Sequence, residues 1–582
     1  MSRRTTVLMV LLLGAFFIGT LLAQGPQLLG TITGIPGQDV QLGNNRKELA
    51  KGDVNGDGYT DLIVGSRKLA NSEKIRIYLG TDVGIDEVPD VTINAPDVIP
   101  DGGFFSAAVG VGDLNNDGFD DIVTGAAWTA IDQSPNAGYV FVYLGGATVD
   151  TIPHLTIPCP HPFMTNAWFG YSIAVGHFND DEYADFYISA TRGSVWGPLP
   201  YQLPGFGYPD PNSETYHGVI YFYEGGATLD GDFDGEPIIG RSSSAQAGNR
   251  GMDRADVNGD GWDDLLLDEH GANWNTDNPM EYVGKVTVWL GGQYRDNAPD
   301  ANLGKQDTAN AALEFFGNDI STAGDVNGDG FDDLIVGTYP GQNNNLGKVY
   351  LFYGPIRSLD PDVILYAPPQ STVPASWGTY GLQELGDIND DGYGDFLVNG
   401  YGENNGDGKA YIFLGSQNFN GGFFTMDGEA GLLTSFGISS LALGDINGDS
   451  IDDFMIAAYG YGIAPGQGRF YLYAGNTGLQ VGMKPITSVA ETFSLSQNYP
   501  NPFNPVTNIR FELPVAGKVT LTVYNDLGQK INTLVDQNML SGLHEVQWDG
   551  RDYVGNMVSS GVYYYRIKTE THEIAKKMVL VK

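Results

Sequence analysis

Residues 52–61 read Gly-Asp-Val-Asn-Gly-Asp-Gly-Tyr-Thr-Asp and lead directly into the apolar run Leu-Ile-Val-Gly at 62–65. The same pattern, Asp-x-Asn-x-Asp-Gly-x-x-Asp or a variant of it, recurs 58 to 79 residues apart along the chain. Its seven starts are Asp53, Asp113, His177, Asp256, Asp325, Asp387 and Asp445. Self-similarity at such intervals is typical of a protein built from one repeated structural unit.

The residues around each loop predict four β-strands per unit. A second β-rich run follows every loop and ends in glycine, as in Gly-Lys-Val-Tyr-Leu-Phe-Tyr-Gly at 347–354. An aromatic-Gly pair precedes several loops, for example at 169–170 and 436–437. Four strands in about 60 residues make one propeller blade. We therefore predict an all-β fold, a seven-bladed β-propeller, in which residues 28–35 add a strand to the last blade and close the ring.

Composition and charge restrict the function. The chain has 582 residues, of which 42% are hydrophobic, so a large core is expected. Its net charge of −41 argues against nucleic acid as a partner, because phosphates would be repelled. The same charge opposes folding by self-repulsion unless cations neutralise part of it.

The repeated loop carries the ligand set of calcium, which takes six to eight oxygens in flexible geometry. Loop positions 1, 3, 5 and 9 offer side-chain oxygens, position 7 offers its carbonyl, and glycine at position 6 permits the turn. The predicted ligands are Asp53, Asn55, Asp57, Tyr59 and Asp61; Asp113, Asn115, Asp117, Phe119 and Asp121; Asp256, Asn258, Asp260, Trp262 and Asp264; Asp325, Asn327, Asp329, Phe331 and Asp333; Asp387, Asn389, Asp391, Tyr393 and Asp395; Asp445, Asn447, Asp449, Ile451 and Asp453.

Two alternatives fit less well. An EF-hand loop needs a carboxylate at position 12, where the first loop has Val64, and flanking helices that the sequence does not predict. Simple turn formation explains Asp, Asn and Gly in one loop but not the same spacing in seven. No Lys or Arg lies within any loop to relieve the repulsion between its carboxylates.

Two loops depart from the pattern. The third has His177 at position 1 and Glu182 in place of glycine, so its site at Asn179, Asp181 and Asp185 is predicted to be weak or lost. The seventh has Ser450 at position 6, a milder change, and is expected to bind. We expect about six calcium ions, or seven if the third loop also binds.

These motifs resemble the FG-GAP repeats of the integrin α-subunit head over about residues 28–476. The resemblance rests on the aromatic-Gly pair, the Gly-Asp-x-Asn-x-Asp-Gly loop and the phrase Ile-Val-Thr-Gly-Ala at 122–126. It implies that the face opposite the calcium loops meets the ligand. Exposed aromatic residues on the loops of that face are the expected anchors: Trp128, Trp196, Tyr201, Phe206, Tyr208 and Trp274. The alternative is that the longest of these loops only packs across the disc.

Catalysis has little support in the sequence. Gly-x-Ser-x-Gly, His-Glu-x-x-His and phosphate-binding loops are absent from it. We therefore predict a binding protein, not an enzyme, that recognises an unknown extracellular protein or glycan. A polysaccharide lyase or hydrolase on a propeller scaffold is the second hypothesis, which carboxylate, His or Tyr clusters at the central axis would favour. A self-associating surface-layer component is the third.

The N-terminus resembles a signal peptide. Arg3 and Arg4 precede an apolar run at 7–22 and a small residue, Ala23, so residues 1–23 predict export and residues 24–480 the propeller. An uncleaved anchor is the alternative. No other apolar run is long enough to span a membrane, so the mature chain is expected to lack a transmembrane segment. Cys159 is the sole cysteine, so no intrachain disulfide can stabilise the exported chain.

A shift in charge marks a second domain. Residues 496–582 carry 9 basic and 8 acidic side chains, whereas the preceding residues carry 21 basic and 63 acidic ones. We expect a linker at 481–494 and an Ig-like β-sandwich at 495–582, with strands at 508–513, 518–524, 544–548, 561–568 and 576–581.

This tail resembles the C-terminal sorting domain of type IX secretion substrates. The resemblance rests on Tyr-Pro-Asn-Pro-Phe at 499–503, Asn-Asp-Leu-Gly-Gln at 525–529, Gly-Val-Tyr-Tyr-Tyr at 561–565 and the terminal Lys-Met-Val-Leu-Val-Lys at 577–582. It implies the type IX machinery as a partner and a secreted or outer-surface location. A plain Ig-like accessory module is the alternative.

Overall fold

The computed structural model describes most of the chain. The described residues are 25–35, 42–66, 74–99, 105–131, 135–160, 166–192, 217–240, 245–269, 284–292, 298–304, 314–340, 347–356, 361–368, 377–419, 421–462, 466–479, 494–495, 497–498, 501–513, 517–539, 542–553, 556–569 and 572–581. The predicted signal peptide and nearly all of the predicted linker lie outside them.

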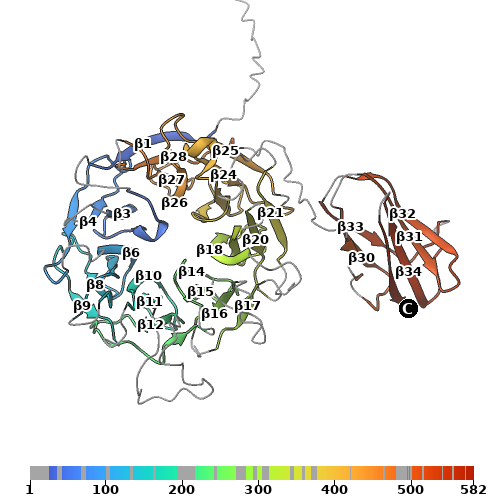
Figure 1. Ribbon diagram of the computed structural model, residues 1–582, viewed down its shortest axis with the longest axis horizontal. Helices are drawn as coiled ribbons and strands as arrows, with labels where there is room; N and C mark the ends of the chain where they lie inside the picture. Colours follow the sequence, from blue (N-terminus) through green and yellow to red (C-terminus); the bar gives the residue numbers. More distant parts are fainter. Residues whose placement is uncertain are drawn as a thin grey trace, which may run out of the picture.

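Seven four-stranded antiparallel sheets form a ring around a central axis (Figure 1). The innermost strands are β2 (Leu49–Gly52), β6 (Phe105–Gly112), β10 (Phe169–Gly176), β14 (Met252–Ala255), β18 (Glu314–Gly324), β22 (Gln383–Gly386) and β26 (Phe436–Gly444). The second strands are β3 (Asp61–Ser66), β7 (Asp121–Ala126), β11 (Asp185–Ala190), β15 (Asp264–Asp268), β19 (Asp333–Pro340), β23 (Asp395–Asn399) and β27 (Asp453–Ala458).

The outer half of each blade follows in chain order. The third strands are β4 (Lys74–Tyr78), β8 (Tyr139–Tyr143), β12 (Val219–Tyr223), β16 (Val286–Trp289), β20 (Lys348–Phe352), β24 (Lys409–Phe413) and β28 (Arg469–Ala474). The outermost strands are β5 (Val91–Asn94), β9 (Leu155–Pro158), β13 (Ile238–Ile239), β17 (Ala301–Leu303), β21 (Val363–Tyr366) and β25 (Phe423–Asp427), with β1 (Gln27–Thr33) in the last blade. The predicted seven-bladed propeller is thus confirmed.

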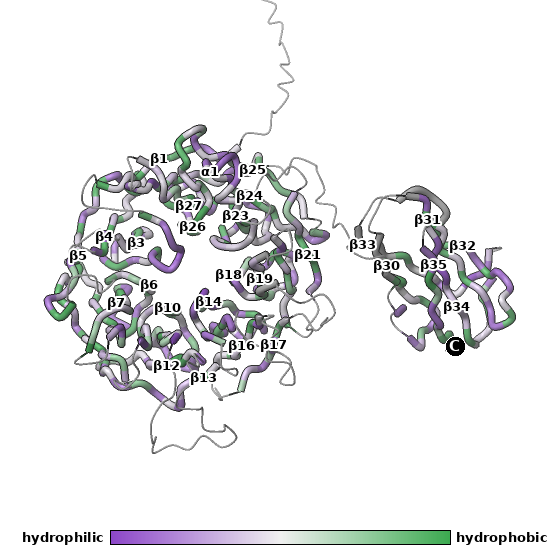
Figure 2. The backbone as a smooth tube through the Cα atoms, viewed as in Figure 1, coloured by the Kyte–Doolittle hydropathy of each residue, from purple (hydrophilic) through white to green (hydrophobic). Residues whose placement is uncertain are grey.

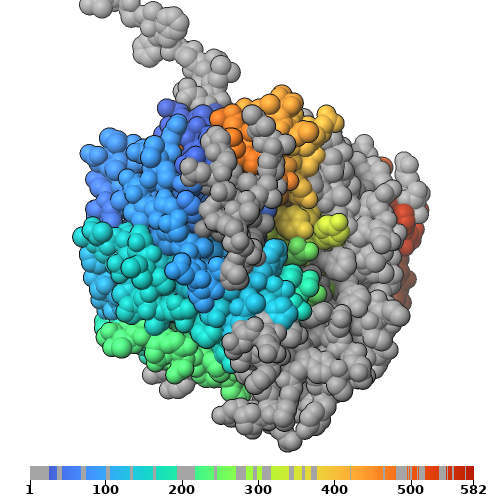
Figure 3. Space-filling view, turned by 60° about the vertical axis from the view of Figure 1, so that its left-hand side comes forward, coloured from blue at the N-terminus to red at the C-terminus, as the bar shows by residue number. Residues whose placement is uncertain are grey.

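The N-terminal strand closes the ring. β1 pairs antiparallel with β28, from Gln27 opposite Ala474 to Thr33 opposite Arg469. The Arg469 Nε donates to Thr33 Oγ1 at 2.9 Å across this pair. The first and last coloured segments of the propeller lie side by side in Figure 3. The expected role of residues 28–35 in the last blade is confirmed, and closure leaves the last blade with a complete outer edge.

The core lies between neighbouring blades. Leu62, Ile63 and Val64 on β3 are all fully buried, because a second strand has a blade packed on each of its faces. Both faces therefore need apolar side chains, which explains a continuous apolar run where a half-buried strand would alternate. A Cβ on Gly125 would lie 1.8 Å from the Gly170 carbonyl oxygen, so adjacent blades approach too closely there for any side chain. In Figure 2 hydrophobic segments alternate with hydrophilic ones around the ring.

The C-terminal domain is a two-sheet sandwich. One sheet holds β29 (Ser494–Leu495), β30 (Thr507–Leu513) and β33 (Gly542–Trp548). The other holds β32 (Lys530–Met539), β31 (Gly517–Asn525), β34 (Gly561–Lys568) and β35 (Glu573–Leu580). Trp548 and Tyr565 are buried in its core. The Ig-like prediction is confirmed, although β29 and β32 were not among the predicted strands.

Helical structure is minor in the described residues. A 3₁₀ turn, η1 (Arg46–Glu48), precedes β2, and one helical turn, α1 (Glu403–Gly406), follows β23. Among the residues that the structure describes, no helix has the length and apolar character needed to cross a membrane.

Candidate metal centres and axial cavities

The calcium-type loops connect the innermost strand of a blade to its second strand. In the first loop, Asp53 Oδ1 accepts the N–H groups of Gly56 at 2.7 Å and Asp57 at 3.0 Å, and its Oδ2 accepts that of Gly58 at 2.8 Å. The position-1 carboxylate thus gathers the backbone of positions 4, 5 and 6 around itself. The same three bonds are made by Asp256, Asp325 and Asp445, and the bonds to positions 5 and 6 by Asp113 and Asp387.

Position 6 requires left-handed backbone. Gly58 has φ +87° and Gly261 has φ +90°, values that glycine adopts without a Cβ penalty. Ser450 in the seventh loop also has a positive φ, +71°, so that loop keeps the common path despite its serine. The milder change predicted for the seventh loop is consistent with this geometry.

In the six regular loops the position-5 side chains are exposed, whereas the position-3 side chains are half-buried, or buried in the case of Asn389. In the first loop Asn55 Nδ2 donates to Asp57 Oδ2 at 2.8 Å, and Asp57 Oδ1 accepts the Tyr59 N–H at 2.9 Å. Each carboxylate has about four acceptor sites, so these bonds leave lone pairs for a cation. Oxygen donors of this kind fit a hard divalent ion such as Ca²⁺.

Position 9 carries a buried carboxylate that locks the hairpin. Asp61 is fully buried, and it accepts the Val54 N–H at 2.9 Å and the Gly80 N–H at 2.8 Å. The same two bonds recur at Asp121, Asp264, Asp333, Asp395 and Asp453. Burial raises the pKa of Asp61 to about 6 and that of Asp395 to about 8, against the lowering effect of their backbone bonds.

The carboxylates of the first loop interact electrostatically. Asp53 and Asp57 both raise the pKa of Asp61 through their negative charge. Among the described residues, no group of three or more His, Cys, Asp or Glu side chains is gathered closely enough to hold a metal ion. The oxygen donors of the regular loops are of the type that calcium prefers, but their side chains are not gathered into a metal site, so the ligand positions stay a prediction.

The third loop has a different internal structure. His177 Nδ1 lies 3.1 Å from the Tyr183 carbonyl oxygen, the position-7 group that a cation would need. Asn179 Nδ2 donates to Asp185 Oδ1 at 3.3 Å, as Asn447 Nδ2 does to Asp453 Oδ1 in the seventh loop, but neither Asp180 nor Glu182 has the positive φ found at positions 4 and 6 of the regular loops. Without a position-1 carboxylate, the His177 ring bonds within the loop, whereas Asp185 Oδ2 is buried without a hydrogen-bond partner.

Sequence reasoning missed a clamp between blades at position 8. Asp120 Oδ2 accepts the Asp53 N–H of the preceding loop at 2.8 Å, and the Asp120 N–H donates to the Asp53 carbonyl at 3.0 Å. Asp263, Asp332 and Asp452 accept in the same way from the residues at position 1 of the preceding loops, His177, Asp256 and Asp387. The visible signal was the Asp-Asp doublet at positions 8 and 9, present in these four loops.

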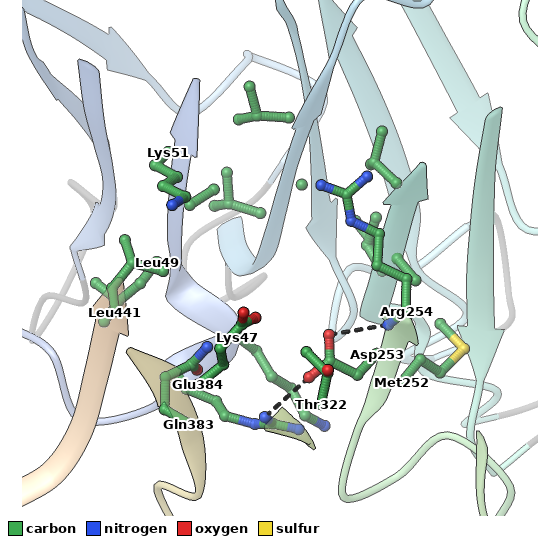
Figure 4. Close-up of a pocket in the computed structure, with 18 of the residues that line it drawn as sticks. Lys47, Leu49, Lys51, Met252, Asp253, Arg254, Thr322, Gln383, Glu384 and Leu441 are labelled. Carbon is green, nitrogen blue, oxygen red and sulfur yellow. Dashed lines mark hydrogen bonds and ion pairs between the residues drawn. The ribbon is translucent and has the colours of Figure 1, made fainter. Parts of the chain in front are cut away.

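All seven innermost strands line an axial cavity of about 420 Å³. Its charged groups include Lys51, Asp253, Arg254 and Glu384 (Figure 4). Asp253 faces Arg46 at 3.4 Å, and Asp263 accepts from Arg254 at 3.1 Å, so both carboxylates are held in ion pairs. Burial raises the pKa of Glu384 to about 7 and lowers that of Lys51. Carboxylates therefore do converge at the axis.

A second axial cavity, of about 370 Å³, lies at the start of the innermost strands. This end is opposite the loops at 53–61 and their equivalents, because the innermost strands all run toward those loops. Arg46 and Lys47 of η1 line both cavities. Arg46 Nε lies 3.3 Å from Asp319 Oδ1, and Nη1 donates to the Leu382 carbonyl at 3.2 Å, so this side chain reaches the fifth and sixth blades.

The predicted partner-binding residues are only partly visible. Trp128 is 40% exposed on the face opposite the metal loops, as expected. The other predicted anchors lie outside the described residues: Trp196, Tyr201, Phe206, Tyr208 and Trp274.

Three family models match parts of the chain. The FG-GAP repeat model matches residues 316–352 and 437–473, and the FG-GAP-like repeat model matches residues 53–124. The FlgD Ig-like domain model matches residues 503–573, within the C-terminal sandwich.

Curated relatives and a solved structure extend the comparison. Integrin alpha-5 of Xenopus laevis is 28% identical over 252 residues, which cover 41% of this chain and 20% of that protein. Phosphatidylinositol-glycan-specific phospholipase D of Bos taurus is 29% identical over 161 residues, covering 26% of this chain and 18% of that protein. The chain thus spans about a fifth of the length of these relatives.

A structure of PorZ, an essential bacterial surface component of the type-IX secretion system of Porphyromonas gingivalis, aligns with a TM-score of 0.34 at 12% identity. The alignment covers 93% of this chain and 60% of that one, and a score at this level establishes no common architecture. The propeller is similar to the FG-GAP repeat region of integrin alpha subunits, and the C-terminal sandwich is similar to an FlgD Ig-like domain.

Proposed function

We propose that this chain is a secreted or cell-surface recognition protein whose propeller is stabilised by calcium and binds a protein or glycan. The observation that carries the calcium part is the repeated geometry of six loops, each with a backbone-gathering carboxylate at position 1 and a buried carboxylate at position 9. When bound, a divalent cation supplies the positive charge that these oxygens lack. The ligands at positions 1, 3, 5, 7 and 9 are those predicted from the sequence.

Thermal unfolding tests the calcium proposal. Each site stabilises the fold by about 2.7 kcal/mol when free calcium exceeds its dissociation constant a hundredfold. We expect chelation with EDTA to lower the Tm by many degrees, and calcium but not magnesium to restore it. An unchanged Tm after complete chelation, checked by elemental analysis, would refute the proposal.

Recognition at the opposite face is supported by Trp128 and by the polar, aromatic cavity at that end of the axis. Glycan and protein arrays probed with the calcium-loaded propeller test it directly. We expect retained binding to a discrete ligand class, with loss on chelation. An array without any retained ligand, on correctly folded protein, contradicts the proposed function.

A second candidate function rests on the carboxylates at the axis. Glu384 lies near Lys51 and Asp332, whose charges act on it in opposite directions, and such sites can serve acid–base chemistry. We favour the non-enzymatic function because Asp253 and Asp263 are held by arginines. Release of reducing ends or unsaturated products from polysaccharides, abolished by Glu384→Gln, would instead support a lyase or hydrolase.

Export through a type IX route is the proposed path for the chain, with residues 495–582 as the sorting domain. Two parts of the proposed signal lie together: Asn501 Oδ1 accepts the Val579 N–H at 2.9 Å, and Phe503 exchanges backbone bonds with Val579 and Val581 at 3.0 Å. Deletion of residues 495–582 should leave the propeller folded but retained in the periplasm. Surface delivery of the truncated chain in a type IX host would refute this role.

A further inference from the structure

Aromatic side chains form a continuous surface from the second blade to the axis. Trp128 packs on Trp168 with ring centroids 5.8 Å apart, and Trp168 packs on Tyr171 at 5.3 Å. The Arg192 guanidinium stacks 3.8 Å from the Trp168 ring centroid. Trp168 has φ +57°, an unfavourable value for a bulky residue, and such strain tends to persist at binding sites. Large half-buried rings held in this way offer flat faces to a ligand.

The aromatic surface ends at the second axial cavity. Tyr171 lines that cavity of about 370 Å³ together with three further half-buried tyrosines, Tyr380, Tyr401 and Tyr459. Asn44, Asn45 and Asn249 line the same cavity. A volume within the about 300–1,000 Å³ range of small-molecule sites, lined by rings and amides, suits a sugar ring, whose apolar face stacks and whose hydroxyls form hydrogen bonds.

Two cations in this cavity are not paired with a carboxylate in the described structure. Lys47 Nζ donates to the Asn249 carbonyl at 2.6 Å and lies 4.5 Å from the Tyr171 centroid. Arg250 Nη1 donates to the Tyr380 hydroxyl at 3.2 Å, and its Nε is buried without a hydrogen-bond partner. Neighbouring Arg46 differs, because Asp253 and Asp319 neutralise it. In a chain of net charge −41, unpaired cations at one cavity need an explanation.

We propose that this cavity binds the carboxylate-bearing sugar of an acidic glycan, with Lys47 and Arg250 facing the carboxylate and neighbouring sugars stacked on Trp128 and Trp168. The inference deepens the proposed recognition function and rests on it. Guanidinium and ammonium groups supply charge-assisted hydrogen bonds to a carboxylate. A glycan fits better than an acidic peptide, because the rings and amides would otherwise face a ligand without matching faces or hydroxyls.

Lys47 makes ligand binding at this site depend on pH. Burial lowers the pKa of Lys47 to about 7; Arg250 and Arg46 lower it further, whereas Asp268 of β15 and Asp319 of β18 raise it. The Tyr171 ring of β10 packs against its ammonium group. A bound carboxylate raises the pKa of Lys47, so binding takes up a proton and strengthens as the pH falls from about 8 to about 6.

Isothermal titration of the calcium-loaded, full-length chain tests the inference. The probes are a short oligogalacturonide, the same oligosaccharide with its carboxylates reduced to alcohols, and a glutamate-rich peptide. We expect the oligogalacturonide to bind at least tenfold more tightly than the other two, with proton uptake measured from buffers of different ionisation enthalpy. Equal or tighter binding of the peptide would assign the site to an acidic protein and overturn the proposal.

Variants distinguish ligand binding in this cavity from nonspecific electrostatic attraction. Arg250→Gln and Lys47→Met should each weaken oligogalacturonide binding about tenfold. Lys47→Met should also abolish proton uptake. Trp168→Ala should weaken the binding of long oligosaccharides more than that of short ones. Lys51→Met, the matched control in the other axial cavity, should bind as the parent chain does. Binding unaffected by Arg250→Gln overturns the inference. If an array ligand binds but uronates do not, the inference fails while the proposed function stands.

Discussion

The third and fourth loops make the same hydrogen bond to the next blade but differ in their internal hydrogen bonds. Both are clamped to the next blade through position 1: His177 N–H donates to Asp263 at 2.8 Å, and Asp256 N–H donates to Asp332 at 3.0 Å. Only Asp256 then gathers three backbone N–H groups, whereas the His177 ring turns to the Tyr183 carbonyl. A loop can therefore lose its predicted cation ligands and still hold two blades together. Blade assembly and the proposed metal binding are therefore separable roles of one nine-residue loop.

The pH dependence of the metal-free protein gives the largest expected effect. Burial raises the pKa of Asp264 to about 7 and that of Asp333 to about 8, far above the unfolded value of about 3.9. A raised folded pKa stabilises the protonated form, so this stability is present below about pH 4 and is lost as the pH rises through 7 and 8. In EDTA, the Tm should fall from about pH 5 to about pH 8 by an amount equivalent to several kcal/mol.

Saturating calcium should reverse that trend, because the cation favours the ionised carboxylates and is released on acidification. Differential scanning fluorimetry over a pH series, with and without calcium, measures both slopes. A metal-free Tm that rises over this range would contradict the burial of the position-9 carboxyls.

A matched pair of position-5 variants isolates the metal contribution. Asp329→Ala and Asp181→Ala both remove an acceptor of a position-7 N–H, from Phe331 at 3.2 Å and from Tyr183 at 2.9 Å. With calcium, Asp329→Ala should cost about 2–3 kcal/mol more than Asp181→Ala, since it also removes a ligand. In EDTA the difference should shrink to the single exposed bond that Asp329 also accepts from Asn327 Nδ2 at 3.0 Å. Equal costs in calcium would mean that the fifth loop binds no better than the third.

The clamp at position 8 predicts a smaller effect that does not depend on calcium. Asp332→Ala removes one acceptor from an inter-blade bond, worth about 1–2 kcal/mol, and Asp263→Ala removes an equivalent bond together with its ion pair to Arg254. Each variant should lower the free energy of unfolding by the same amount with and without EDTA, although one clamps a regular loop and the other the third loop. Chemical denaturation measures the change, and a calcium-dependent difference between them would refute the separation of roles.

Rebuilding the third loop should change the calcium stoichiometry more clearly than the stability. His177→Asp with Glu182→Gly restores the position-1 carboxylate and the position-6 glycine. We expect one additional calcium ion per chain by elemental analysis and a gain of about 1–3 kcal/mol at saturating calcium. His177→Asp alone serves as control, because Glu182 would still resist the left-handed turn.

The repeats made most of the fold predictable, since seven similar loops fixed the blade count and the strand order within each blade. The clamp was not predictable, because Asp120 and Asp121 look alike in sequence while one reaches the preceding blade and the other stays in its own. Contacts of Arg46 with Asp253 and Asp319 join residues more than 200 positions apart, and no local pattern reports them. β32 was missed because Lys-Ile-Asn-Thr-Leu-Val-Asp-Gln-Asn-Met at 530–539 does not alternate cleanly.

The pairing of β1 with β28 has a consequence for how the protein is made. The first strand of the ring must wait for residues 469–474, which are synthesised last among the propeller strands. Until then the growing chain has two unsatisfied sheet edges, which are open to proteases and to misassembly. A chain that ends before residue 469 therefore cannot pair β1, and it keeps both of these sheet edges exposed.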